Sequence, residues 1–379
     1  MSVSVRDKQQ IIVSLDDSLE LAKSQQELNV IEHIARHLDA IFKNIDTATS
    51  GYLNLITCLI CSSLNDEIDP RFHRKPGKGM PKPENPDGWF SGRTVSEKII
   101  YPWMELKGFR TAKSGWQTRT YERPKPYTLD YPENIAIIKE PFLKTLDFAT
   151  KNRSKRQSLV AYLFRKEIEY KGRKGKLVER VSKNNIGNEV LIIDIMSALE
   201  RHFASPNSAH LPVIAIYSIY ELLINEVDNY SVLSLRPLES HQASDLRTGS
   251  VGDIELEDLE SDVIEGVEVK HGIEIDLPIL LRAKEKILKS SLKRYYILTT
   301  HQSCAVINND VLGVVRDVYA THGCQIIVNG VIPTIRYYLR MCSNPSEFIN
   351  NYSKNIVTQD SVTADHLEIW KAVQDKLST

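Results

Sequence analysis

The hydrophobic pattern of the chain changes at Pro212, and this change limits the fold more than any other feature. Upstream, apolar residues recur mostly at helical spacing. Downstream, short apolar runs typical of strands alternate with helical segments. The expected elements are, in order, a helix over 212–227, strands over 232–235, 254–256 and 267–269, a helix over 277–290, a strand over 295–299, a helix over 311–321, a strand over 325–328 and a closing helix over 363–376. This order predicts an α/β (α+β) domain in which helices flank a mixed β-sheet.

The first half of the chain is predicted to be mainly helical and rich in loops. The expected elements are helices within 1–65, a Pro- and Gly-rich loop over 69–88, a helix over 91–107 that Gly108 ends, and two helices between 141 and 158 and between 188 and 203. Pro102 is expected to kink or interrupt its helix. The run KGRKGK at 171–176 predicts a flexible segment. We therefore expect a helical and loop-rich region over 1–204 and a second domain over 205–379.

Charge is distributed unevenly along the chain. Residues 71–176 hold 25 Lys and Arg against 11 Asp and Glu, whereas the remainder holds 23 against 38. This division indicates a polyanion-binding surface beside a group of carboxylates. Solvated loops are the alternative interpretation for any single basic residue. The candidate contacts to DNA, with Arg93 foremost, are Arg93, Lys113, Gln117, Arg119, Arg123, Lys125, Arg153, Lys155 and Arg156.

Cysteine content and hydropathy restrict the classes of protein to consider. Five cysteines are an odd number, and a chain of 379 residues needs no disulfides for stability, so a reduced cytoplasm is expected. No apolar run reaches the roughly 18 residues of a membrane span, so no membrane partner is expected. Cys58 and Cys61 have C-x-x-C spacing, but their apolar helical surroundings favour core packing over zinc. The chain lacks a P-loop signature, which argues against an ATPase or translocase.

The segment VGDIELEDLESDVIEGVEVKHG carries the strongest chemical signal. Asp253 opens one strand, and the tripeptide EVK at 268–270 lies on the next. Alternate side chains of a strand share a face, so Glu268 and Lys270 project together and the valines between them pack into the core. If the two strands pair, Asp253 and Glu268 lie side by side and form, with the backbone carbonyl of Val269, a hard-oxygen site for Mg²⁺. Lys270 beside that metal can lower the pKa of an attacking water or stabilise charge on a phosphate.

The pattern E-x-K is weakly specific by itself. It occurs at 105–107, 169–171 and 268–270, and only the third copy lies in an apolar strand with an aspartate strand upstream. The alternative interpretation of this copy is a surface hairpin with solvated charges.

Acids upstream of this strand pair are candidates to join the site. Glu221, and also Glu226, lie on the helix expected over 212–227, where a solvent-facing position is the alternative. Glu239, His241 and Asp245 lie just before the first strand of the pair, and a plain hydrogen-bonding role is the alternative for the histidine.

Together these motifs resemble the PD-(D/E)xK nuclease superfamily, and the resemblance covers residues 212–330. The segment SGRTVSEKIIYP and the layout of the chain are similar to type II restriction endonucleases of the SacI-like group. The resemblance implies a restriction-endonuclease-like sheet core and Mg²⁺-dependent hydrolysis of double-stranded DNA. It makes Asp253 and Glu268 the metal ligands and Lys270 the catalytic lysine. Gly252, not proline, precedes the aspartate, at a position that is lax in such enzymes.

The resemblance also has implications for partners. A homodimer is the simplest assembly that cuts both strands of a symmetric site. Restriction enzymes work alongside a cognate DNA methyltransferase, which implies a prokaryotic cytoplasm. Two alternatives stay open: a junction or repair nuclease on the same core, and a catalytically inert DNA-binding regulator. The regulator is expected to have an incomplete metal site, whereas all three catalytic residues are present here.

Overall fold

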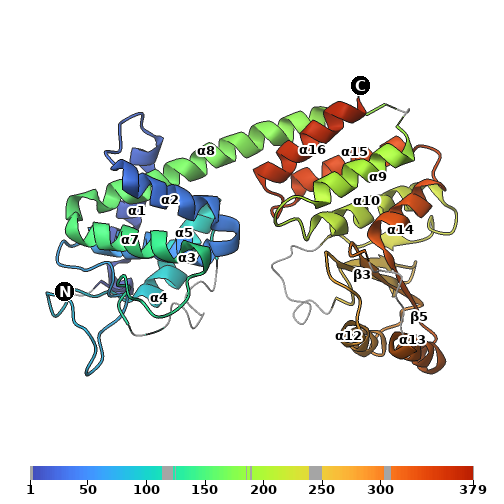
Figure 1. Ribbon diagram of the computed structural model, residues 1–379, viewed down its shortest axis with the longest axis horizontal. Helices are drawn as coiled ribbons and strands as arrows, with labels where there is room; N and C mark the ends of the chain where they lie inside the picture. Colours follow the sequence, from blue (N-terminus) through green and yellow to red (C-terminus); the bar gives the residue numbers. More distant parts are fainter. Residues whose placement is uncertain are drawn as a thin grey trace. The chain divides into compact units, whose positions relative to one another are not determined.

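A computed structural model of the protein describes residues 3–112, 123, 125–184, 186–187, 190–238, 250–302 and 309–378. The chain forms two compact units, Met1–Gly172 and Arg173–Thr379 (Figure 1). Their division falls inside helix α8 (Arg156–Lys183), whereas the sequence placed it at 204/205. None of the described helices combines the length and apolarity that crossing a membrane requires.

The first unit is built from helices and loops. Its helices are α1 (Lys8–Lys23), α2 (Glu32–Lys43), α3 (Ile45–Ser63), α4 (Gly92–Val95), α5 (Tyr101–Leu106), α7 (Lys139–Lys151) and the first part of α8. Helix α3 is buried along almost its whole length and packs against α1, α2 and α7. Cys58 and Cys61 lie inside it, and burial raises the pKa of both thiols. Their position agrees with the expected core packing.

The helix expected over 91–107 is present and changes its helical type before Pro102. It runs as α4, a π-helical segment (Ser96–Ile100) and α5. In a regular α-helix a proline lacks one N–H donor, and its ring collides with the carbonyl four residues earlier. The π-helical turn, in which the Tyr101 N–H donates to the Ser96 carbonyl, widens the backbone just before the proline. The helix therefore continues past Pro102.

The sequence prediction was wrong about residues 171–176. This basic run lies within α8, which continues from Arg156 to Lys183. Lysine, arginine and glutamate are good helix formers, and the two glycines lower helix stability by only about 1 kcal/mol each. The helical surroundings on both sides therefore outweigh Gly172 and Gly175.

The second unit contains a five-stranded mixed sheet with the strand order β1-β2-β3-β4-β5. The strands are β1 (Ser234–Leu235), β2 (Ile254–Glu257), β3 (Val263–Lys270), β4 (Arg294–Thr299) and β5 (Gln325–Gly330). β1, β2 and β3 pair antiparallel, whereas β3, β4 and β5 pair parallel. The general α/β (α+β) class and the helix-rich N-terminal region are thereby confirmed.

Helices cover both faces of this sheet (Figure 1). The helices of the unit are α9 (Ile192–Phe203), α10 (Leu211–Glu226), α12 (Leu277–Ile287), α13 (Asn309–His322), α14 (Val331–Leu339), α15 (Pro345–Thr358) and α16 (Ala364–Leu377). α12 and α13 pack on one face through an apolar cluster that includes Ile279, Tyr295 and Val318. α10 and α14 lie on the other face.

Helix α10 differs from the amphipathic helix expected over 212–227. Nearly every residue from Leu211 to Leu223 is buried. The reason is tertiary, because α10 is covered by α14 and α15 as well as by the sheet. A helix enclosed in this way needs apolar residues all round.

Replacing Gly172 and Gly175 with alanine should stabilise α8. An added Cβ has no neighbouring atom within 4 Å at either position, and alanine is favoured over glycine in helices by about 1 kcal/mol. We expect the double variant to unfold at a higher temperature in a circular dichroism melt. Gly108→Ala is the control and should lower the midpoint, because Gly108 has a φ of +63°. A lower midpoint for the double variant would contradict a continuous helix.

Candidate active site

The register of β2 and β3 brings Asp253 opposite Glu268. Ile254 pairs with Val267 in the antiparallel ladder. Asp253, the residue before Ile254, therefore faces Glu268, the residue after Val267. The Val269 N–H donates to the Asp253 carboxylate (Oδ2) over 2.7 Å. The sequence predicted that the two strands would pair in this way. Asp253 is held by the backbone of the strand that carries Glu268.

Gly252 allows this close approach. A Cβ at this position would lie 2.8 Å from the Val267 carbonyl oxygen and 3.1 Å from the Val267 nitrogen. Backbone atoms cannot move aside without shifting the strand. Any side chain here would push Asp253 away from β3.

Glu268 interacts with three side chains from three different elements. Lys270, two residues further along β3, forms an ion pair with the Glu268 Oε1. Lys286 of α12 lies 3.2 Å from Oε2, and the Tyr295 hydroxyl of β4 lies 3.1 Å from the same oxygen. The Tyr295 hydroxyl also lies 2.8 Å from the Val251 carbonyl. The carboxylate is thus fixed in position on the face of the sheet that α12 covers.

Sequence reasoning missed Lys286. The sequence pattern that could have revealed it is helical spacing, because Ile279, Ala283 and Lys286 lie on one side of α12. Ile279 and Ala283 are buried against the sheet. A lysine in phase with two core residues is held against the sheet, and here it reaches Glu268.

The two carboxylates have opposite pKa shifts. Burial and the nearby charge of Glu268 raise the pKa of Asp253 to about 6. Burial also acts to raise the pKa of Glu268, but Lys270 and Lys286 outweigh it and hold that pKa below its ordinary value. When Asp253 is ionised, it therefore repels the carboxylate of Glu268, which stays ionised.

A cavity of about 220 Å³ adjoins Glu268 between β3, β4 and α12. Its polar lining consists of Glu268, Lys270, Arg282, Lys286 and Tyr295, and its apolar lining of Ile279, Ala283 and Ile297. Three cationic side chains against one carboxylate leave the cavity with a positive charge. Such a cavity suits an anionic group of the size of a phosphate.

The donor atoms at this place fit one hard divalent cation. Asp253 and Glu268 supply carboxylate oxygens. The Val269 carbonyl lies on the same edge of β3 as the Val269 N–H, which Asp253 approaches. Oxygen ligands of these kinds are those that Mg²⁺ takes, with water completing the shell. Within the described residues no three His, Cys, Asp or Glu side chains gather as a larger metal cluster.

Two other candidate acids lie elsewhere. Glu221 accepts a hydrogen bond of 2.6 Å from Asn355 of α15, and Glu226 accepts one of 2.7 Å from the Ser343 hydroxyl. Both side chains belong to α10, which covers the face of the sheet opposite α12 (Figure 1). The structure therefore does not bring Glu221 or Glu226 to Asp253. The candidates Glu239, His241 and Asp245 lie outside the described residues.

One of the predicted DNA contacts is corrected by its burial. Arg156 is only 1% exposed, and its guanidinium donates to the carbonyls of Ala149 and Ser62. Burial lowers the pKa of this guanidinium to about 10. Its role is to join α8 to the ends of α3 and α7, because the carbonyls that it binds lie near those ends.

The remaining predicted contacts have varied surroundings. Arg93 pairs with Glu97 at 3.1 Å, and Arg123 pairs with Glu133. Arg153 lies 3.9 Å from Glu84 and is half exposed. Lys125 is exposed and Lys155 is half-buried. The three other candidates, Lys113, Gln117 and Arg119, lie outside the described residues.

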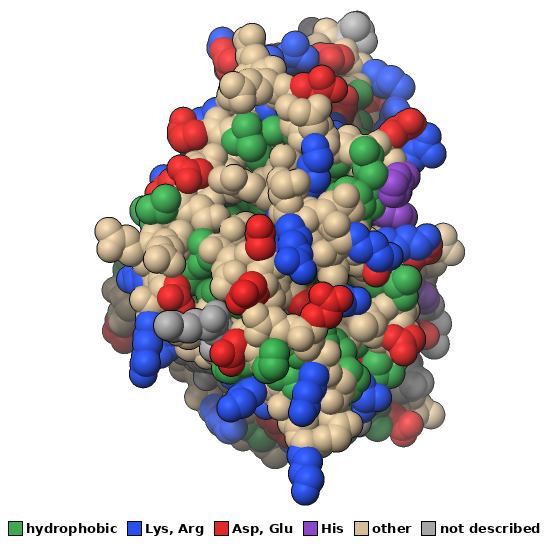
Figure 2. Space-filling model, turned by 90° about the vertical axis from the view of Figure 1, so that its left-hand side faces the viewer, with side chains coloured by type: hydrophobic (Ala, Val, Ile, Leu, Met, Phe, Trp, Pro, Cys, Tyr) green, Lys and Arg blue, Asp and Glu red, His purple; other side chains and the backbone are tan. Residues whose placement is uncertain are grey.

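The basic excess of residues 71–176 is reduced by acids from the start of the chain. Arg110 pairs with Asp46 at 3.1 Å, and Lys166 pairs with Asp39 at 3.1 Å. The whole unit of residues 1–172 holds 27 Lys and Arg against 22 Asp and Glu. Basic and acidic side chains also stand among one another on the face shown in Figure 2. On this face the positive charge is mixed with negative charge and forms no broad basic patch.

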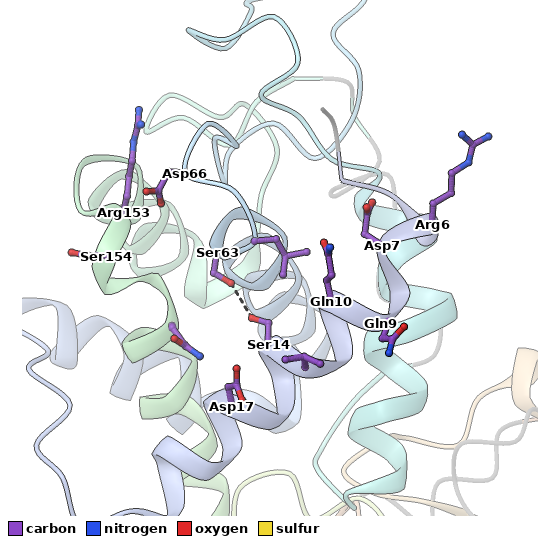
Figure 3. Close-up of a pocket in the computed structure, with 13 residues that line it drawn as sticks. Arg6, Asp7, Gln9, Gln10, Ser14, Asp17, Ser63, Asp66, Arg153 and Ser154 are labelled. Atoms are coloured by element: carbon purple, nitrogen blue, oxygen red, sulfur yellow. Dashed lines mark hydrogen bonds between the residues drawn. The ribbon is translucent and has the colours of Figure 1, made fainter.

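A larger cavity of about 940 Å³ lies in the first unit between α1 and the start of α8 (Figure 3). Its charged lining residues are Arg6, Asp7, Asp17, Asp66 and Arg153, with the arginines at opposite ends. The Ser14 and Ser63 hydroxyls lie 3.1 Å apart within it. Because both basic and acidic side chains line this cavity, its charge favours no one class of ligand. We therefore do not take it as the candidate site, although it is larger.

Neither the known protein families nor the curated proteins compared with this chain match it. The geometry and charges around Asp253 and Glu268 therefore carry the functional conclusion.

Gly252→Ala should destabilise the protein and displace Asp253. The added methyl group must force β2 and β3 apart, and overpacking of this kind costs about 1–3 kcal/mol. Gly313→Ala is the matched control, because a Cβ there meets nothing within 4 Å and the residue lies inside α13. Urea unfolding of both variants measures the difference. Equal stability of the two variants would contradict the close approach at Val267.

Asp253→Asn should stabilise the metal-free protein at alkaline pH. The folded state raises the Asp253 pKa from 3.8 to about 6. Ionised Asp253 therefore weakens folding most above pH 6, and the cost disappears as the pH falls toward 4. Asparagine keeps an oxygen for the Val269 N–H and carries no charge. We expect a gain of about 1–3 kcal/mol in unfolding free energy above pH 6 with EDTA present.

Urea unfolding across a pH series tests this expectation. Glu260→Gln is the control, since Glu260 is exposed in the turn between β2 and β3. A gain for Asp253→Asn that did not depend on pH would show that its charge is not the cause.

Proposed function

We propose that this protein is a Mg²⁺-dependent nuclease that hydrolyses phosphodiester bonds in double-stranded DNA. The observation that carries the proposal is the arrangement around β3. Asp253 is bonded to the Val269 N–H, Glu268 lies opposite on the same face, and Lys270 is paired with Glu268. A solvated surface hairpin does not account for carboxylates that are largely buried.

Asp253, Glu268 and the Val269 carbonyl would hold the metal. When bound, Mg²⁺ would supply the positive charge that lowers the pKa of an attacking water and offsets charge on the phosphate. Burial, and after it the charge of Glu268, raises the Asp253 pKa, and a bound cation would offset the repulsion between the two carboxylates. The high metal-free pKa of Asp253 is therefore consistent with a site built to hold a cation.

The lysines have separate tasks in this proposal. Lys270 lines the cavity beside Glu268, where its ammonium group can orient a water molecule or bind a phosphate oxygen. Lys286 and Arg282 of α12 line the opposite wall and would bind the remaining phosphate charge. Tyr295 holds Glu268 in place through its hydroxyl.

The more specific form of the proposal is a type II restriction endonuclease. It is supported by the sequence resemblance over 212–330 and by the α-β-β-β-α-β-α-β order observed in the second unit. This form includes a homodimer that cuts both strands at a symmetric site. It also includes a cognate DNA methyltransferase as functional partner and a prokaryotic cytoplasmic setting. Discrete fragments from plasmid DNA would support this form, whereas a smear would favour a repair nuclease.

Asp253→Ala, Glu268→Ala and Lys270→Ala should each abolish plasmid cleavage in Mg²⁺. The first two variants lose a metal ligand, and the third loses the cation beside the reacting phosphate. We expect Lys270→Ala to bind DNA nearly as well as the original protein when Ca²⁺ replaces Mg²⁺. Gel electrophoresis measures cleavage, and fluorescence anisotropy of a labelled duplex measures binding.

Matched controls come from the same segments. Glu260→Ala and Lys289→Ala remove one acid and one base that are exposed near the same strands. Both should cleave at the original rate. Unchanged cleavage by any of the three site variants would overturn the assignment of that residue.

A further inference from the structure

A second cavity of about 360 Å³ lies in the first unit, where the loop over 69–88 meets the start of α4. Its lining residues are His73, Arg74, Lys75, Trp89, Ser91, Gly92, Arg93 and Thr94. The volume falls in the range of about 300–1,000 Å³ that is common for small-molecule pockets. The cavity is therefore large enough for a small organic ligand.

The charge of this cavity is positive. Arg74, Lys75 and Arg93 line it, and its described lining residues include no aspartate or glutamate. His73 adds no charge at neutral pH, because burial lowers its pKa to about 4. Arg93 is paired with Glu97 at 3.1 Å, one turn further along the helix and outside the lining. An anionic ligand would compete with Glu97 for that guanidinium.

The start of α4 adds backbone donors to these cations. α4 continues through the π-helical segment into α5, so the whole helix runs over 92–106. Its N-cap residue, Ser91, makes no side-chain capping bond, and the Gly92 N–H donates to the His73 carbonyl over 2.8 Å. The first-turn N–H groups of a helix have no carbonyl partner within the helix. The Gly92 N–H is already bonded to His73, so the start of the helix contributes the positive end of its dipole, which beside Arg74, Lys75 and Arg93 favours a phosphate group.

Trp89 gives the cavity an aromatic wall. Its side chain is half-buried, with part of its surface facing the cavity. His73, which also lines the cavity, stacks its ring on Tyr127 with centroids 4.4 Å apart. An indole beside three cations matches a ligand that has both a flat ring and a phosphate.

We propose that this cavity binds a phosphorylated nucleotide, with the phosphate at Arg74, Lys75 and the start of α4 and the base against Trp89. The two cavities described above differ from it in chemistry. The cavity beside Glu268 contains a carboxylate, and the one between α1 and α8 contains three aspartates. The nucleotide can be free in solution or part of a nucleic-acid strand, since both present the same phosphate and base.

The test is a calorimetric titration of the full chain in EDTA. The probes are adenosine 5′-monophosphate, adenosine, inorganic phosphate and a short DNA duplex. The variants are Arg74→Ala with Lys75→Ala, Trp89→Ala and Trp89→Phe. Lys23→Ala with Arg36→Ala is the matched control, since it removes two exposed basic residues from α1 and α2 of the same unit. All variants are checked for an unchanged melting temperature.

We expect the arginine–lysine variant to weaken binding of the monophosphate roughly tenfold or more. Trp89→Ala should weaken it about tenfold, and Trp89→Phe should restore most of the affinity. Adenosine should bind far more weakly than its monophosphate. Inorganic phosphate should compete with the monophosphate, and the control variant should bind like the original protein.

The outcomes also separate the two sources of the ligand. If the protein binds the monophosphate and the pocket variants weaken this binding, the ligand is a free nucleotide. If only the duplex binds and the pocket variants weaken that binding, the ligand is a nucleic-acid strand. Both results support the phosphate site. Equal affinity for adenosine and its monophosphate would overturn the proposal, as would pocket variants that bind both probes normally. Absence of binding to either probe would overturn it too. None of these results depends on Asp253, Glu268 or plasmid cleavage, so the nuclease proposal can fail independently.

Discussion

The hydrogen bond from the Val269 N–H to the Asp253 carboxylate is the contact on which the candidate site depends. It forms because Gly252 lets one strand lie directly against the Val267 backbone. The same contact places two partly buried carboxylates side by side, which costs free energy when both are ionised. The closeness of Asp253 and Glu268 thus has two consequences. It makes the two carboxylates repel each other, and it would let them share one metal ion, as we propose.

The side chains that hold Glu268 come from two strands and a helix, so the site forms only when these elements pack together. Lys270 comes from β3, Lys286 from α12 and Tyr295 from β4. The opposite face of β3 also holds a buried acid. Glu265 accepts a hydrogen bond of 2.6 Å from Tyr220 of α10 and lies 3.0 Å from Arg294. β3 is thus held by polar contacts on both faces, and its position fixes the side chains of the candidate site.

The two units differ in how they use charge. In the second unit, cations gather around one buried carboxylate. In the first unit, basic residues pair with acids both within one helix, as Lys144 does with Glu140, and between distant segments, as Arg110 does with Asp46. Against this mixed background the cavity at Arg74, Lys75 and Trp89 has a clear excess of positive charge. The nucleotide site that we propose there rests on this local arrangement of side chains and not on the total charge of residues 71–176.

The sequence by itself determined the order of elements from α10 to β5 and the pairing of Asp253 with the E-x-K strand, but it missed α14 and α15. Strand alternation and hydrophobic period are local properties, and both can be read from neighbouring residues. The length of α8, the burial of Arg156 and the enclosure of α10 could not be read in this way. Each depends on which distant segments pack against the residue. Only the tertiary structure brought Lys286 to Glu268, because a helix and a strand that are apart in sequence meet through the core between them.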